Sequence, residues 1–114
     1  MERGDVVRVD LPPPLGVAGG EQIGERPAVI LQVKLAANLD TVLVVPCTSK
    51  LHNSRHFGAV QVAASALNGL DVESVFLVHQ LRAIDQRRVR RVAGKVSAED
   101  FSRIEANVRE ILGL

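Results

Sequence analysis

The chain has very few of the residues that form disulfides and structural metal sites. It contains one cysteine, Cys47, so no disulfide can form within the chain. A lone cysteine among apolar neighbours is typical of a small core residue. The three histidines, His52, His56 and His79, belong to no Cys/His cluster with zinc spacing. We therefore expect no disulfide, no metal site and no cofactor.

Long apolar runs are also absent. The longest, such as 28–31 and 42–45, fall far short of the roughly 20 apolar residues of a membrane span. The charged N-terminal residues 1–10 lack the apolar region of a signal peptide. We therefore expect a cytoplasmic protein without membrane contact. With 46% hydrophobic and 24% charged residues, the 114 residues favour one folded domain, 1–114.

An excess of charge of one sign is missing too. The 14 Lys and Arg residues nearly balance 13 Asp and Glu residues, so the net charge is +1 and local clusters matter more than the total. The segment 82–91 is the main basic cluster and contains Arg82, Arg87, Arg88, Arg90 and Arg91. The planar guanidinium of arginine can donate two hydrogen bonds to one phosphate. A basic run is nevertheless most often a solvated face, so alone it indicates nucleic acid only weakly.

Apolar patterning predicts a series of short strands. Residues 7–11 alternate between apolar and polar, which is typical of a half-buried strand. Residues 27–33 form a β-branched run that predicts a second strand, with Pro27 at its start or on an edge. Residues 41–47 are continuously apolar after Thr41, which predicts a central strand buried on both faces, with Pro46 ending its ladder.

The remaining segments contain weaker signals. Residues 12–24 are rich in Pro and Gly and predict a long loop, and residues 50–57 predict a polar, basic loop. Asn68-Gly69 predicts a turn. Further strands are predicted over 58–62, 74–78 and 80–84, with a short break near 85–88.

The end of the chain changes to helical periodicity. One helical face is predicted to carry Phe101, Ile104, Val108, Ile111 and Leu112. Ser97 is a suitable N-cap, and Gly113 closes the helix. Strands followed by one helix predict an α+β fold: a small, mostly antiparallel, strongly bent sheet or open barrel with a C-terminal α-helix.

Two polar segments could contain a functional site. The segment 19–27 is glycine-rich, which permits close backbone approach to a ligand, and includes Glu21 and Arg26. Residues 46–50 follow a buried strand, which holds polar groups such as Thr48 rigidly. Each segment also has an ordinary explanation, as a plain loop or as one half of a surface ion pair.

Five segments, in order along nearly the whole chain, share a family resemblance: Arg3–Val7, Glu21–Ile30, Val44–Ser49, His79–Asp85 and Ile111–Leu114. Together they resemble the MazF/PemK family of toxins from bacterial toxin–antitoxin pairs. The resemblance implies an SH3-like barrel with a terminal helix, usually a homodimer. It also implies a sequence-specific endoribonuclease acting on single-stranded RNA, inhibited by an antitoxin whose C-terminal segment occupies the RNA groove.

The resemblance also assigns roles to single residues. Arg26 matches the catalytic arginine of the Gly-x-Arg-Pro element, and Thr48 matches the catalytic threonine. Glu21 matches an acidic loop residue beside the RNA, and we count it with the catalytic group. Gln80 matches a glutamine opposite the site. We expect further contacts to RNA from Gln22, Ser49, Lys50, Arg82 and His79.

The sequence departs from the family pattern at several points. His79 stands where an acidic residue is common, residues 12–20 form a longer and more Pro-rich loop, and Phe57 is the one aromatic residue expected at the groove rim. Base stacking on aromatic side chains is a usual source of single-strand affinity. These departures therefore bear on the recognised RNA sequence more than on activity.

RNA supplies its own nucleophile, the 2′-OH, so cleavage without a metal is expected. We expect Arg26 to stabilise phosphorane charge and Thr48 to contact the same phosphate. The proton acceptor stays open between Glu21, Arg26 and His79, although a guanidinium hardly deprotonates. The main alternative is a CcdB-like toxin that binds a gyrase subunit and cuts nothing, and a catalytically silent regulator is a third.

Overall fold

The computed structural model describes residues 1–11, 24–33 and 38–114, and its described part folds as one bent antiparallel sheet with a C-terminal helix. The strands are β1 (Asp5–Leu11), β2 (Gly24–Ile30), β3 (Thr41–Thr48), β4 (Ala59–Val62), β5 (Ser74–Leu77), β6 (Arg82–Asp85) and β7 (Val89–Lys95). The helices are η2 (Leu51–Arg55), η3 (Val78–Gln80), η4 (Gln86–Arg88) and α1 (Ala98–Leu112). The predicted fold class is confirmed.

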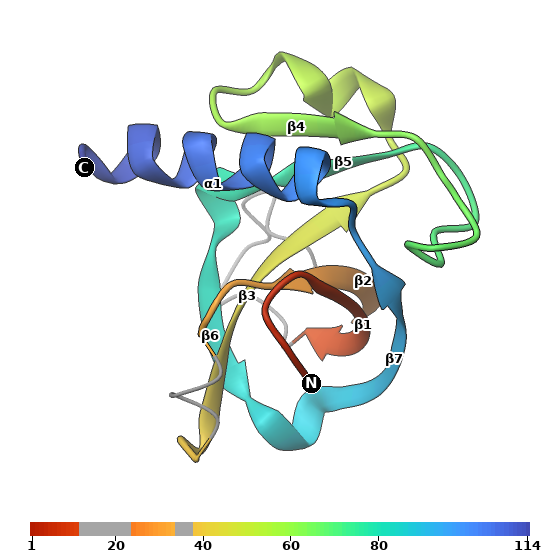
Figure 1. Ribbon diagram of the computed structural model, residues 1–114, viewed down its shortest axis with the longest axis vertical. Helices are drawn as coiled ribbons and strands as arrows, with labels where there is room; N and C mark the ends of the chain where they lie inside the picture. The colour runs from red at the N-terminus through yellow and green to blue at the C-terminus, as the bar shows by residue number, and fades with distance from the viewer. Residues whose placement is uncertain (12–23, 34–37) are drawn as a thin grey trace.

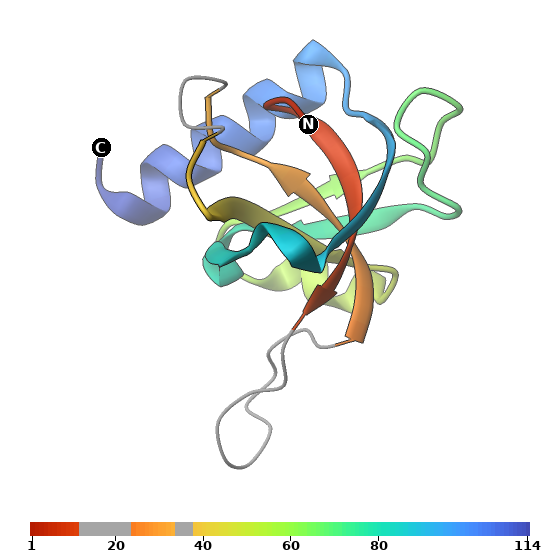
Figure 2. The ribbon, with the colours of Figure 1, turned by 90° about the horizontal axis from the view of Figure 1, so that it is seen from below.

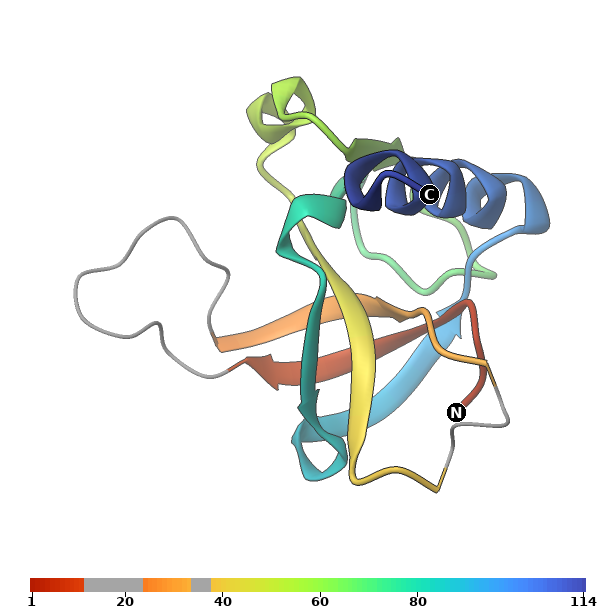
Figure 3. The ribbon, with the colours of Figure 1, turned by 90° about the vertical axis from the view of Figure 1, so that its left-hand side faces the viewer.

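The sheet curls into a barrel that is not fully closed. Its strand order is β4-β5-β3-β2-β1-β7, with β6 pairing β3 beside this path, so β4 and β7 form the two ends. Figure 3 shows α1 and β4 at one end of the molecule and β1, β2 and β7 at the other, with β3 and β6 running between them. No helix among the described residues is long and apolar enough to cross a bilayer.

Strand β3 holds the barrel together because it changes partners along its length. It pairs with β6 over Thr41–Val44, with β2 over Val44–Pro46 and with β5 at Cys47 and Thr48. Pro46 therefore ends the β2 ladder, as predicted, but the strand continues to Thr48. The prediction that both faces are buried is correct only for its second half, because Thr41 and Leu43 are exposed.

The predicted bounds of the second strand were wrong. Strand β2 runs from Gly24 to Ile30, so Pro27 lies in its middle rather than at its start. Pro27 is opposite Arg8 of β1, while pairing with β3 begins only at Ala28. Proline is tolerated there because this half of β2 has a neighbour on one side only and is locally an edge.

Two elements near the basic segments were not predicted. Residues 50–57 contain the 3₁₀ helix η2, and residues 89–95 form β7, which pairs with β1 through two irregularities in register. Alternation is lost in β7, where Arg90, Arg91 and Val92 are all exposed. Polar residues on both faces of an edge strand remove the period-2 signal that identifies a strand.

Two apolar clusters form the core, and α1 covers one of them. Ile104 is fully buried in the cluster that includes Val45, Phe76 and Val78, with Phe101, Val108 and Ile111 packed against it. The predicted helix face is confirmed except for Leu112, which is 56% exposed. Ser97 caps the helix by accepting from the Asp100 amide at 3.0 Å, and Gly113 ends it with a positive φ.

Candidate functional site

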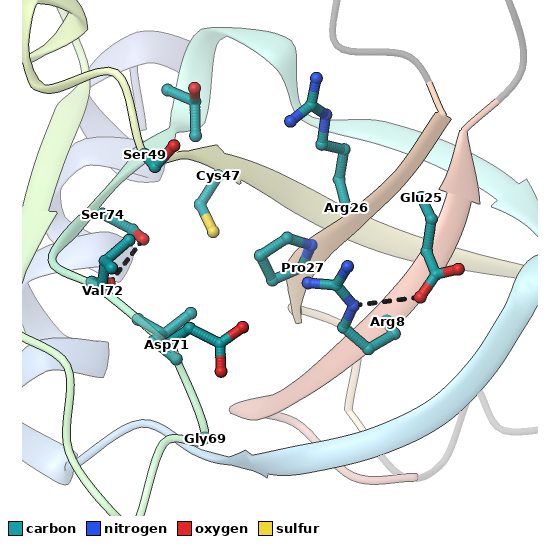
Figure 4. Close-up of a pocket in the computed structure, with 12 residues that line it drawn as sticks. Arg8, Glu25, Arg26, Pro27, Cys47, Ser49, Gly69, Asp71, Val72 and Ser74 are labelled. Carbon is teal, nitrogen blue, oxygen red and sulfur yellow. Dashed lines mark hydrogen bonds and ion pairs between the residues drawn. The ribbon is translucent and has the colours of Figure 1, made fainter.

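A polar pocket of about 180 Å³ opens where the end of β3 meets the paired strands β1 and β2. Figure 4 shows the side chains around it converging from three parts of the chain. The pocket is lined by Arg8, Glu25, Arg26, Pro27, Cys47, Thr48, Ser49, Gly69, Leu70, Asp71, Val72 and Ser74. The two residues predicted to carry the chemistry, Arg26 and Thr48, therefore line one pocket.

Thr48 is the last residue of β3 and is held rigidly. It is 4% exposed, and its backbone is opposite Val75 of β5. Its Oγ1 accepts the backbone N–H of Lys50 at 3.2 Å. A hydroxyl that accepts one hydrogen bond still has its own hydrogen to donate. Thr48 can therefore present a fixed O–H donor to a ligand in the pocket.

Arg26 is half-buried in the part of β2 that pairs with β1, opposite Val9. Its guanidinium extends away from Pro27 along the rim in Figure 4. A guanidinium has five N–H donors in a planar fork that suits phosphate oxygens. Arg26 and Thr48 together thus supply a charged fork and a hydroxyl donor, a pair suited to an oxyanion.

A second arginine, Arg8, lines the same pocket from β1. Its Nε donates to Glu25 Oε1 at 3.3 Å, and the two residues are diagonal neighbours across the β1–β2 pair. Cross-strand diagonal neighbours lie within reach of long side chains. The ion pair holds Arg8 in place beside Pro27 (Figure 4). The site therefore has two cationic side chains and not one.

Cys47 forms part of the pocket wall but is fully buried. Burial raises the pKa of the Cys47 thiol to about 12, against smaller lowering effects of a hydrogen bond with Ser74 and of the charges on Arg8 and Arg26. The thiol therefore stays protonated near neutral pH and is not a nucleophile.

The third wall of the pocket comes from the loop 63–73 and is anchored by Asn68. Asn68 is 2% exposed, and its Oδ1 accepts the amides of Ser65 and Leu70, both at 3.0 Å. Its Nδ2 donates to the Ala63 carbonyl at 2.9 Å. The predicted turn is confirmed, but Asn68 stabilises the loop rather than facing the pocket. The loop brings the exposed carboxylate of Asp71 to the rim.

Four of the other residues predicted to bind RNA follow β3 or lie on η3. Ser49 lines the pocket, whereas the exposed Lys50 follows it outside the pocket wall. Gln80 and His79 lie on η3, where the exposed His79 ring is 5.1 Å from that of His56. Burial first, and the charge of His56 second, lower the pKa of His79. His79 and Gln80 do not line the pocket.

Arg82 lies on β6 and does not line the pocket. It begins β6 opposite Val44, and Thr48 is four positions further along β3, roughly 13 Å away at strand spacing. Glu21 and Gln22 lie outside the described residues. The contacts to RNA predicted for Arg82, Glu21 and Gln22, and for the residues of the preceding paragraph, stay predictions. Arg8, Glu25 and Asp71 were missed because a charged residue in an alternating strand or a loop looks like ordinary surface.

The basic run is partly neutralised by neighbouring acids. Arg87 is paired with Asp85 at 2.8 Å, and Arg90 with Asp10 at 3.1 Å. The hydrogen bonds from Arg87 hold the pKa of Asp85 at about 2. The described residues contain no group of three or more His, Cys, Asp or Glu side chains able to hold a metal ion.

Comparison with known families identifies the relatives of this chain. Residues 2–112 match the profile of the PemK-like, MazF-like toxins of type II toxin–antitoxin systems. The chain belongs to this toxin family. A relative of the PemK/MazF-like chain, the endoribonuclease MazF of Staphylococcus saprophyticus, is 32% identical over 115 aligned positions, covering 100% of this chain and 92% of that protein. The suspected resemblance is confirmed.

Solved structures share the fold of this PemK/MazF-like chain. MazF from Deinococcus radiodurans matches with a TM-score of 0.81 at 23% identity, covering 100% of this chain and 97% of that one. A mycobacterial endoribonuclease in complex with its cognate antitoxin matches with a TM-score of 0.75 at 20% identity, covering 100% and 96%. These likenesses support the barrel with its terminal helix over the whole chain.

Proposed function

We propose that this toxin-family chain is a metal-independent, sequence-specific endoribonuclease that cleaves single-stranded RNA in the pocket of Arg26 and Thr48. The observation that carries the proposal is the presence of a charged fork and a fixed hydroxyl donor in one pocket. The 32% identity to an endoribonuclease MazF supports the same activity. Both observations favour RNA cleavage over the gyrase-binding alternative.

The reaction follows from what the pocket can stabilise. The RNA 2′-oxygen attacks the adjacent phosphorus, the bond between phosphorus and the 5′-oxygen breaks, and negative charge grows on the non-bridging oxygens. Arg26 donates two N–H groups to these oxygens, and Thr48 donates its hydroxyl hydrogen. The products are a 2′,3′-cyclic phosphate, or its 3′-phosphate, and a 5′-OH end.

Two proton transfers complete the reaction. The 2′-OH loses its proton to a base, and the departing 5′-oxygen gains one from water. We assign the acceptor role to Glu21, because a carboxylate can accept a proton, whereas the guanidinium of Arg26 serves best as the positive charge at the phosphate. Gln22, Ser49, Lys50, His79, Gln80 and Arg82 are proposed as contacts to the RNA on either side of the cut.

Metal independence is tested with a chelator. Because Arg26 supplies the positive charge at the phosphate, cleavage of a long mixed-sequence RNA should proceed unchanged in EDTA. Mapping of the cut ends should give 5′-OH termini at discrete sites. Loss of cleavage in EDTA, with recovery on adding a divalent ion, contradicts the metal-free reaction.

The two proposed catalytic residues are tested by substitution with matched controls. Arg26→Ala and Thr48→Ala should each lower the cleavage rate by at least about 10²-fold, the usual effect of removing one transition-state donor. Arg109→Ala and Thr41→Ala remove the same side chains from exposed positions on α1 and at the far end of β3. The controls should cleave normally. Full activity in either test variant, with circular dichroism unchanged, excludes that residue.

The cellular partners follow from the same proposal. We propose a cytoplasmic homodimer inhibited by an antitoxin whose C-terminal segment occupies the RNA-binding groove. A structural neighbour solved in complex with its cognate antitoxin supports an antitoxin partner. Sedimentation should show a dimer, and a synthetic peptide of the antitoxin C-terminus should block cleavage competitively with RNA. Inhibition that excess RNA fails to relieve contradicts shared occupancy.

A further inference from the structure

The pocket extends beyond the pair that contacts the phosphate. Arg8 and Asp71 line the same pocket as Arg26, Thr48 and Ser49. Figure 4 shows the Asp71 carboxylate and the Arg8 guanidinium facing each other across the opening, with Pro27 beside Arg8. The role proposed for Arg26 and Thr48 leaves this second half of the pocket without a function.

Asp71 is the acidic group in that half with no partner of its own. Glu25 is paired with Arg8, whereas no hydrogen bond or ion pair joins the Asp71 side chain to another described residue. The loop that carries Asp71 is nevertheless fixed by the buried Asn68. A carboxylate on an anchored loop presents acceptor atoms in a constant position, which suits recognition of N–H donors.

Arg8 and Pro27 provide flat surfaces beside Asp71. The ion pair with Glu25 uses Nε of Arg8, and the terminal nitrogens of the guanidinium turn toward the pocket (Figure 4). Unstacked RNA bases pack against guanidinium planes as they do against aromatic rings. The pocket volume of about 180 Å³ is comparable to the roughly 150 Å³ of a cavity that holds one benzene ring, so the pocket is of the size of one planar base.

We propose that this half of the pocket holds one unstacked base next to the cut, and that Asp71 selects guanine there. Guanine presents two adjacent N–H donors, N1–H and N2–H, that match the two oxygens of a carboxylate. Adenine and cytosine present one amino donor beside an acceptor, and uracil presents one N–H between two acceptors. The assignment rests on the proposed RNA cleavage and adds a specificity-determining residue to it.

The test compares cleavage of RNAs that differ only in the nucleotide on either side of the cut. The wild-type protein should prefer guanine at one of these positions by about five- to tenfold, the lower range for a bidentate base contact because Asp71 is exposed. Asp71→Asn should lose this preference, so that the ratio of its rates on the guanine RNA and on the other RNAs falls to about one. Glu73→Gln removes the same charge from the same loop outside the pocket, and should keep the preference.

Inosine tests the contact at the level of one group. Inosine keeps N1–H but lacks the 2-amino group, so wild-type cleavage should fall when it replaces the preferred guanine. Asp71→Asn should not distinguish the two bases. An unchanged preference in Asp71→Asn, a uniform rate loss on all RNAs, or a wild-type protein indifferent to guanine overturns the inference. Absence of any cleavage by the wild-type protein instead overturns the proposed function.

Discussion

Hydrogen-bond geometry at Thr48 decides which substitutions its position can tolerate. Its oxygen already accepts the Lys50 amide, so its hydroxyl hydrogen is directed elsewhere. The side chain is also almost fully buried and shares the pocket wall with Cys47, so its methyl group has little room to be lost without a packing defect. The hydroxyl and the methyl group therefore have separate roles, one in chemistry and one in packing.

Thr48→Ser and Thr48→Val separate these roles. Serine keeps the hydroxyl, so we expect cleavage within about tenfold of wild type, whereas isosteric valine should lower kcat by about 10²- to 10³-fold. Steady-state cleavage of a defined RNA measures both. Equal activity of the serine and valine variants contradicts donation by Thr48.

The buried thiol of Cys47 makes stability depend on alkaline pH. Its folded pKa of about 12 lies above the ordinary value of 9.0. Above pH 9 the unfolded thiol ionises while the folded thiol does not, so stability should fall as pH rises from 9 toward 12. Denaturant melts of wild type and Cys47→Ala should show this fall only in wild type.

The native thiol of Cys47 should also resist alkylation at pH 8, and rapid modification would contradict its burial.

At the scale of elements, the loop 63–73 bridges the gap that strand pairing leaves open. The barrel ends at β4 and β7, and the loop that follows β4 contacts β7: the Lys95 amide donates to the Leu67 carbonyl at 2.8 Å. Figure 2 shows this loop projecting on the same side of the molecule as β7. Gly69 allows the contact, because a Cβ there would lie 2.2 Å from the Ala93 carbonyl oxygen.

Gly69→Ala should therefore destabilise the protein strongly. The φ of +68° costs an L-residue about 1–2 kcal/mol, and the backbone clash adds about 1–3 kcal/mol. Gly113→Ala is a matched control, since Gly113 has a φ of +72° but nothing within 4 Å of its Cβ position. Urea unfolding of the two variants gives the comparison. Equal losses of stability would show that the loop does not need close contact with β7.

At the scale of the whole molecule, packing of the helix onto the open barrel stabilises the domain. Ile104 of α1 is fully buried, with 0% exposure, in the cluster that includes residues of β3, β4 and β5. Removing its side chain should leave a cavity where helix and sheet meet. The helix thus stabilises the half of the barrel that carries the end of β3.

Ile104→Ala should lower the free energy of unfolding by about 2–5 kcal/mol, the usual range for a buried Ile truncation. Leu112→Ala also removes three carbon atoms, but from a side chain that is 56% exposed, and should change stability by about 0.5 kcal/mol or less. Chemical denaturation checks both. A small effect at Ile104 would show that the helix is not needed for a stable barrel.

Local patterns in the sequence determined much of the architecture. Periodicity identified β1 and α1, and the Ser97 and Gly113 caps are local hydrogen-bonding motifs that need no distant partner. The element types were therefore readable wherever the side-chain pattern matched one buried face. Strand β7 was not readable, because exposed side chains on both of its faces remove the alternation that identifies a strand. For Pro27, the edge position, one of the two places predicted, is the one observed.

By itself, the sequence determined the helix, most strands and the family. It also singled out Arg26 and Thr48 as catalytic candidates, because they match motifs of that family. Only the tertiary structure decided that Arg8, Glu25 and Asp71 share their pocket. These residues come from two paired strands and a distant loop, and nothing in their local sequence separates them from solvated surface charges. Their proximity arises from strand register and from the contact of the 63–73 loop with β7, which are long-range interactions.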